Sequence, residues 1–335
     1  MTTSRSFSST LGPTITSYVT IKKALGRRFD VEADILAHLD RFLLGQASDS
    51  GAAFTSQSFA AWTLTLAHLR PTVRRNHMRI VRNLCLYLRR TDPDCFVPDP
   101  SSFPAPHAPP RPHIFTEEQI VRLLRIASTL RSRSDTPLCA EVFRLAIVLL
   151  YTAGLRRGEL VRLVLADYDP AERTLLIRAS KFHKSRLVAL SDDAAREMGL
   201  YLRVRQRLPH AASSPLLVNR CGGLRAYSGA SFGRSMQHLF RRADIYTAKG
   251  CAPRVHDLRH THAVHALLRW YRAGVDVQAK LPVLATAMGH VSIASTAYYL
   301  PFLEPVAQAA SERFARHCHS TLPATAVPDA GGGKR

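Results

Sequence analysis

The residue types that could do chemistry are concentrated in four segments of the C-terminal half of the sequence. These segments combine arginine, histidine, lysine and tyrosine side chains with few carboxylates. They read TAGLRRGEL (152–160), SKFHKSRLVAL (180–190), HDLRHTHA (256–263) and MGHVSIASTAYYL (288–300).

Two arginines and two histidines in these segments suit the binding of a phosphate group. Arg156 and Arg259 carry planar guanidinium groups, each of which can bind two oxygens of one phosphate. His256 and His290 can donate hydrogen bonds to the same oxygens. The segments offer no carboxylate cluster that could hold Mg²⁺, so the arginines would have to supply the positive charge.

A lysine and a tyrosine complete the inventory that phosphodiester cleavage requires. Lys181, on its flexible stem, could deliver a proton, and Tyr299 offers a hydroxyl nucleophile. Cleavage needs charge neutralisation, a nucleophile and an acid for the leaving group. The four segments therefore predict phosphodiester chemistry.

In their order and separations, the segments resemble the motifs of the tyrosine recombinase (phage integrase) family. The family motifs run approximately T-G-L-R-x-S-E-L, G-K-G-x-K-x-R, H-x-L-R-H-T and L-G-H-x-S, with a tyrosine nine residues past the last histidine. H-D-L-R-H-T is specific, whereas each other motif is weak alone and strong within the ordered set. The catalytic set that the resemblance implies is Arg156, Lys181, His256, Arg259, His290 and Tyr299.

The second motif departs from the family pattern around its lysine. Ser180 and Phe182 replace the glycines that flank the family lysine, so Lys184 stays a rival to Lys181 as the general acid. In the first motif, Gly158 stands where the family usually has Ser or Thr, while Glu159 fits the pattern and is expected to support structure rather than chemistry.

Two adjacent tyrosines compete for the role of nucleophile. Tyr298 and Tyr299 would point about 100° apart on a helix, so only one can face the site. The nine-residue spacing from His290 selects Tyr299. The histidines of 256–265 could also suggest zinc, but no Glu or third ligand follows at a known spacing.

The resemblance implies a site-specific recombinase that cuts and rejoins double-stranded DNA through a 3′-phosphotyrosyl intermediate. It implies no cofactor, neither metal nor ATP, and a homotetramer on two DNA duplexes or association with related recombinases. Two alternatives remain open. A type IB topoisomerase-like enzyme would relax supercoils as a monomer, and a non-catalytic DNA-binding protein on the same fold would never form a covalent adduct.

The charge balance agrees with a polyanionic partner. Lys and Arg total 46 against 25 acidic residues, a net charge of +21, and such a field attracts nucleic acid. A membrane surface is the weaker interpretation because the basic residues are spread along the chain. The six cysteines are scattered without a C-x-x-C pair, and no apolar run of 18 residues occurs, so we expect a cytoplasmic protein with reduced thiols.

Composition divides the chain into four parts. We expect a helical domain over residues 1–97, a Pro-rich linker over 98–113, a catalytic domain over 114–318 and a disordered tail over 319–335. Helical periodicity in the first domain predicts helices over roughly 14–26, 31–44, 55–68 and 71–90.

The last of these helices carries arginines on a face separate from its apolar stripe. Arg75, Arg79 and Arg82 lie together and have no acidic residue four positions away. They are therefore predicted to contact DNA phosphates, although a solvated charged face is the simpler alternative.

The second domain shows a helical pattern interrupted by short alternating segments. Thr116 is an expected helix cap, Gly154 is expected to end an apolar helix, and a short helix is expected from about Arg156. The pairs Leu175/Ile177 and Leu187/Ala189 fit strands. We expect a mainly α fold with a small antiparallel β-sheet. The resemblance further implies a two-domain DNA clamp, a helical core-binding domain plus an integrase-like catalytic domain.

Overall fold

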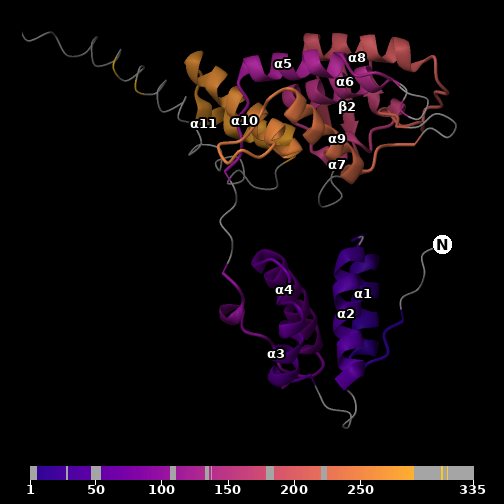
Figure 1. The fold of residues 1–335 in the computed structure, drawn as a ribbon, viewed down its shortest axis with the longest axis vertical. Coiled ribbons are helices and arrows are strands. Elements are labelled where there is room, and N and C mark those ends of the chain that lie inside the picture. The colour runs from indigo at the N-terminus through magenta and orange to yellow at the C-terminus, as the bar shows by residue number, and fades with distance from the viewer. Residues whose placement is uncertain are drawn as a thin grey trace, which may run out of the picture. The chain divides into compact units, whose positions relative to one another are not determined.

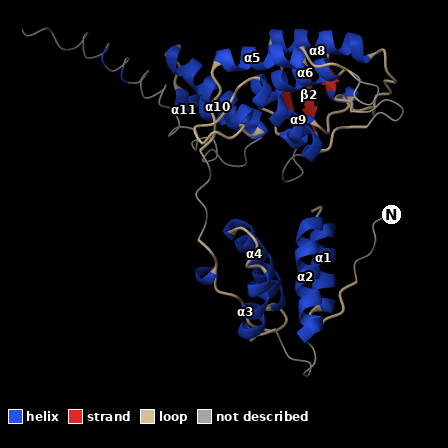
Figure 2. Ribbon diagram, in the orientation of Figure 1, coloured by secondary structure: helices blue, strands red, loops and turns tan. Residues whose placement is uncertain are grey.

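The computed structural model describes residues 6–27, 29–46, 54–105, 111–132, 136, 138–178, 185–219, 225–289, 311 and 315. The chain divides into two compact units, Met1–Pro110 and Arg111–Arg335, and this boundary falls within the Pro-rich segment. Both units are dominated by helices, and one small sheet lies in the second (Figures 1 and 2). None of the described helices is both long and apolar enough to cross a membrane.

The first unit is built from helices that bury one apolar face around Trp62, a fully buried side chain. Thr55 caps the third helix by accepting a hydrogen bond from the Ser58 amide, and Pro71 begins the fourth, where no amide donor is needed. The described helices match the periodicity of the sequence to within a few residues. They are α1 (Gly12–Ala24), α2 (Asp30–Gln46), α3 (Ser56–Thr65) and α4 (Pro71–Leu88).

The beginning of the Pro-rich segment packs on this helical unit. Phe103 is only 7% exposed and belongs to the same apolar core. Arg75 donates a hydrogen bond to the Pro104 carbonyl at 2.7 Å, and Arg82 donates to the Pro98 carbonyl at 3.0 Å. Residues 98–105 are therefore held against α4 by one buried aromatic ring and two arginines.

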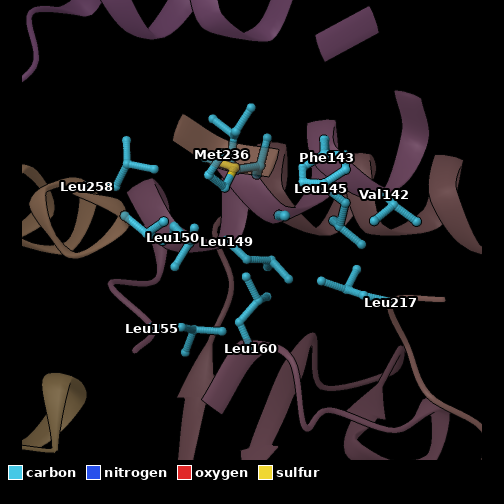
Figure 3. Packing of buried hydrophobic residues seen from close by; sticks show 14 of the residues in the cluster. Val142, Phe143, Leu145, Leu149, Leu150, Leu155, Leu160, Leu217, Met236 and Leu258 are labelled. Carbon is cyan, nitrogen blue, oxygen red and sulfur yellow. The ribbon is translucent and has the colours of Figure 1, made fainter. Parts of the chain in front are cut away.

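The second unit is organised around α6, whose residues from Val142 to Leu150 are almost all buried (Figure 3). The predicted cap at Thr116 is confirmed, since its side chain accepts from the Gln119 amide. The helices are α5 (Glu117–Ser128), α6 (Cys139–Thr152), α7 (Arg157–Leu160), α8 (Asp192–Arg205), α9 (Gly229–Arg242), α10 (Val255–Arg272) and α11 (Val277–Met288).

The small sheet is three-stranded and antiparallel, in the order β1-β2-β3. The strands are β1 (Tyr168–Asp169), β2 (Thr174–Ile177) and β3 (Arg186–Ala189), with Leu175 opposite Val188. Leu175 and Ile177 lie in a strand as expected, and both are buried in the core. In β3 the buried position is Val188, whereas Leu187 and Ala189 are exposed. The strand begins at Arg186. The predicted mainly α fold with a small antiparallel sheet is confirmed.

The packing of Phe103 gives a stability prediction. Phe103→Ala should lower the free energy of unfolding of the first unit by about 3 kcal/mol, because a buried ring is replaced by a cavity. The measurement is a denaturant titration followed by the fluorescence of Trp62, in a Trp270→Phe background. Ser101→Ala, at an exposed position of the same segment, is the matched control. Equal midpoints for both variants would contradict the packing.

Candidate active site

A buried carboxylate organises the predicted site. Glu159 lies in α7 and is only 3% exposed. It accepts a hydrogen bond from the Arg156 backbone amide at 2.9 Å and forms an ion pair with the Arg156 guanidinium at 2.6 Å. Glu159 therefore fixes both the backbone and the side chain of the first predicted catalytic arginine.

A second arginine reaches the same carboxylate from the sheet. The two terminal nitrogens of Arg186, at the start of β3, donate to the two carboxylate oxygens of Glu159 at 3.0 and 2.9 Å. Burial by itself would raise the pKa of Glu159, but the hydrogen bonds and charges of Arg186 and Arg156 outweigh it and hold the pKa at about 2. The carboxylate is thus ionised across the physiological range.

Three arginines converge on the carboxyl end of α11. Arg186 donates through Nε to the Ala287 carbonyl at 2.9 Å, Arg259 to Met288 at 2.6 Å, and Arg156 to Gly289 at 2.6 Å. The last carbonyls of a helix have no partner within the helix and carry partial negative charge. The end of α11 therefore stabilises three positive groups close together.

Glycines stand at the two tightest points of this arrangement. Gly154 has φ +59°, and a Cβ there would lie 2.5 Å from the His262 ring. Its carbonyl accepts a hydrogen bond from Arg259 at 2.5 Å. Gly289 has φ +66°, and a Cβ there would lie 2.7 Å from Arg186. Both positions require the left-handed conformation that glycine adopts without strain.

His256 and Arg156 line one pocket of about 640 Å³ on the second unit. His256 lies in the first turn of α10, and its ring edge meets His260 at 4.6 Å between centroids. Removal of water by the surrounding protein, together with the charges of Arg259, Arg254 and Arg156, lowers the pKa of His256 to about 4. His256 is therefore neutral near pH 7 and can donate one ring N–H.

The pocket has further basic residues that the motifs did not single out. Arg157, Arg234 and Arg254 line it, and no carboxylate is found among the described lining residues. Arg157 lies over the first turn of α9, where a Cβ at Gly233 would come within 3.0 Å of its guanidinium. Arg157 lies inside the first motif segment and the other two in an arginine-containing stretch, but arginine is too frequent in this chain for either signal to be specific.

The structure thus brings Arg156, His256 and Arg259 together. Arg259 is only 1% exposed and lies one helical turn beyond His256, outside the pocket lining. Arg186 is the residue of the second motif that sequence reasoning left without a role. The other predicted residues, Lys181, His290 and Tyr299, and their rivals Lys184 and Tyr298, lie outside the described residues.

The remaining histidines of this region have structural surroundings. His262 contacts the Tyr151 carbonyl through Nδ1 at 2.9 Å, and burial lowers its pKa to about 4. His265 pairs with the Tyr151 hydroxyl at 3.0 Å. Among the described residues, no group of three or more His, Cys, Asp or Glu side chains is arranged to hold a metal ion.

The three predicted DNA-binding arginines lie on α4 of the first unit. Arg75 and Arg82 donate to the carbonyls of Pro104 and Pro98, as described above. Arg79 is exposed and donates to the Asn76 side chain at 2.9 Å. Their contact with DNA stays a prediction.

The pKa of Glu159 predicts how stability depends on pH. A folded-state pKa of about 2, below the ordinary 4.5, stabilises the fold above about pH 4.5, and this contribution is lost as the pH falls towards 2. Glu159→Gln should therefore be less stable than wild type by about 3 kcal/mol near pH 7, and the difference should shrink at acid pH. Chemical denaturation at a series of pH values measures it.

Glu172→Gln, which removes an exposed carboxylate, is the control and should change stability little. A difference between wild type and Glu159→Gln that stays constant from pH 7 to pH 2 would contradict the assignment of Glu159 as the ionised centre.

Comparison with known proteins identifies the family of this chain. The sequence profile of the phage integrase family matches residues 113–303. A putative integrase/recombinase, y4rB, of Sinorhizobium fredii is 32% identical over 295 residues, covering 87% of this chain and 93% of the relative. The tyrosine recombinase XerD of Rhizobium meliloti is 34% identical over 194 residues, covering 58% of each chain.

Solved structures share the fold. The XerH site-specific recombinase, in a post-cleavage complex with its difH substrate, superposes with a TM-score of 0.61 at 18% identity, covering 85% of this chain and 79% of XerH. The Tn1549 transposon integrase, in complex with circular intermediate DNA, gives 0.61 at 18% identity, covering 87% of this chain and 95% of that one. With the family profile matching more than half of its residues, this chain belongs to the phage integrase family and is a tyrosine recombinase, a DNA strand transferase.

Proposed function

We propose that this protein is a site-specific recombinase that cuts and rejoins double-stranded DNA through a 3′-phosphotyrosyl intermediate. The observation that carries the proposal is the convergence of Arg156 and Arg259 on the carboxyl end of α11. His290 follows Gly289 directly in the chain, and Tyr299 lies nine residues further on. One helix end therefore connects the phosphate-binding arginines to the segment with the proposed nucleophile.

In the proposed first step, the Tyr299 hydroxyl oxygen attacks the scissile phosphorus and loses its proton to water. The bond from phosphorus to the 5′-oxygen breaks, and Lys181 protonates that oxygen, which leaves as a 5′-hydroxyl. The 5′-hydroxyl of a partner strand then attacks the phosphotyrosyl bond and releases Tyr299. The number of phosphodiester bonds is unchanged, so no ATP is consumed.

Arg156 and Arg259 stabilise the charge that develops on the phosphoryl oxygens, and His256 and His290 donate hydrogen bonds to them. The low pKa of His256 means that this residue is neutral near pH 7 in the DNA-free protein, with one ring N–H to donate. Arg186 and Glu159 are positioning residues, because they hold Arg156 and the end of α11. In this scheme, arginines neutralise the charge that a metal ion would otherwise neutralise.

We further propose the partners and the assembly. The pocket cations Arg157, Arg234 and Arg254 contact the DNA backbone beside the scissile phosphate, and their positions around Arg156 and His256 support this. The two units together clamp the duplex, and four protomers act on two duplexes. The DNA in the solved XerH and Tn1549 integrase complexes supports a double-stranded DNA partner for this chain.

Tyr299 can be tested against its neighbour. Tyr299→Phe should abolish covalent DNA adducts and leave DNA binding nearly unchanged, because only one hydroxyl is lost. Tyr298→Phe should retain cleavage. Both variants are assayed with suicide substrates drawn from DNA that flanks the gene, and the adduct is mapped by peptide sequencing. If Tyr298→Phe is the inactive variant, the assignment of the nucleophile is wrong.

The role of the arginines predicts independence from divalent ions. Adduct formation should persist at an unchanged rate in excess EDTA, because guanidinium groups supply the positive charge. Arg156→Lys, which keeps one charge but loses the planar pair of donors, should slow cleavage on the order of 100-fold or more. A strict requirement for Mg²⁺ would exclude the arginine-based mechanism.

A further inference from the structure

A second basic pocket lies on the first unit, between α1 and α4. It has a volume of about 390 Å³ and combines four cationic side chains with aromatic rings. We call this pocket the α1–α4 cradle. Its cations are Lys22, Arg27, Arg79 and Arg90.

The cations of the cradle are available to a ligand. Arg27, Arg79 and Arg90 are exposed, and none of the four cations forms an ion pair with a described carboxylate. Glu32 is the one carboxylate among the described residues that line the cradle. An unpaired positive cluster of this kind favours a polyanion.

Aromatic rings hold two of these cations in place. The Lys22 ammonium lies 5.0 Å from the centroid of Tyr18, and the Arg90 guanidinium lies 5.9 Å from that of Tyr87. Such cation–π contacts limit the motion of the side chains without neutralising their charge. Less conformational entropy is then lost when an anion binds.

Two of the three rings that line the cradle, Tyr18 and Phe29, are not positioned to stack on a base. Tyr18 is 4% exposed and Phe29 is 8% exposed, and the two rings pack edge to face at 5.6 Å. The accessible groups are instead mainly the four cations, with Asn83, Leu86 and the partly exposed ring of Tyr87 beside Arg90. These groups suit phosphate oxygens and sugar, so the cradle fits the backbone of a nucleic acid better than its bases.

The structure also separates the cradle from the neighbouring arginines of α4. Arg75 and Arg82 donate to carbonyls of residues 98–105, whereas Arg79 lines the cradle. Within the arginine face expected from the sequence, only Arg79 therefore belongs to the open basic surface. Lys22 and Arg27 join it from the other side, although no pattern in the sequence connects them to α4.

We propose that the α1–α4 cradle is a phosphate-backbone binding site for double-stranded DNA and provides the main electrostatic contact of the first unit. The proposal rests on the proposed function, since it takes DNA as the ligand. It differs from the sequence expectation in assigning this contact to Lys22, Arg27, Arg79 and Arg90 rather than to Arg75 and Arg82.

The test compares two charge-matched double variants of the full chain. Arg27→Gln/Arg90→Gln removes two exposed cations of the cradle, and Arg41→Gln/Arg70→Gln removes two exposed arginines of the same unit outside it. Binding to a long duplex of arbitrary sequence is titrated at several salt concentrations. Arg27→Lys/Arg90→Lys, which keeps the charges, should bind like wild type.

Each phosphate contact contributes about 0.9 to the slope of log K against log salt. The cradle variant should therefore lose about 1.8 from this slope, and its deficit relative to wild type should shrink about twelvefold between about 50 and 200 mM salt. The control variant should keep the wild-type slope. An unchanged slope in the cradle variant, or equal losses in both variants, would overturn the proposal.

Failure of the proposed function gives a different result. Wild type should form covalent adducts on suicide substrates at low salt and saturating DNA, a result that does not depend on the salt slopes of the variants. If wild type forms adducts but the slopes are equal, only the cradle is wrong. If wild type forms none while the cradle variant loses slope, the cradle stands and the nucleophilic mechanism fails.

Discussion

The proposed active site depends on three guanidinium groups that are held close together in the absence of DNA. Arg156, Arg186 and Arg259 would repel one another in a medium of low dielectric constant. The Glu159 carboxylate pairs with two of them, and the carbonyls of Ala287, Met288 and Gly289 accept one hydrogen bond from each. Neutralising Glu159 would lower the stability of the fold, because Arg156 and Arg186 would be left partly buried without their counter-ion.

This arrangement couples the site to the chain that follows it. Arg156 and Arg259 are tied to adjacent carbonyls at the end of α11, and His290 is the next residue in the sequence. A shift of this helix end would therefore move both arginines together. Preorganised donors of this kind are effective because they need little rearrangement when charge develops on the substrate.

Much of the fold and of the candidate site could be predicted from the sequence, and there are physical reasons why the other features could not. Helical periodicity predicted the helices, and the ordered motifs predicted that Arg156, His256 and Arg259 lie close together. The partners of Arg186 could not be predicted, since a backbone carbonyl as acceptor leaves no trace in residue types. Phe103 lies among prolines, where no periodicity distinguishes a ring that packs from a ring in a linker. In β3, the run Leu187–Ala189 is apolar throughout, so alternation could not choose the buried face.

The net charge of the chain does not by itself show which cations bind a ligand, because arginines also make internal hydrogen bonds. Only seven of the 46 basic residues are lysines. Arginine has five donors in a planar fork and can serve as an internal hydrogen-bond donor. Arg205, which is fully buried, donates to the carbonyls of Pro209 and Pro215, just as Arg75 and Arg82 hold residues 98–105. Some of the positive charge thus stabilises the fold, and the cations available to a ligand are distinguished by their surroundings. The cations proposed to bind DNA, such as Arg234 and Arg90, are exposed and line pockets with few carboxylates among the described residues.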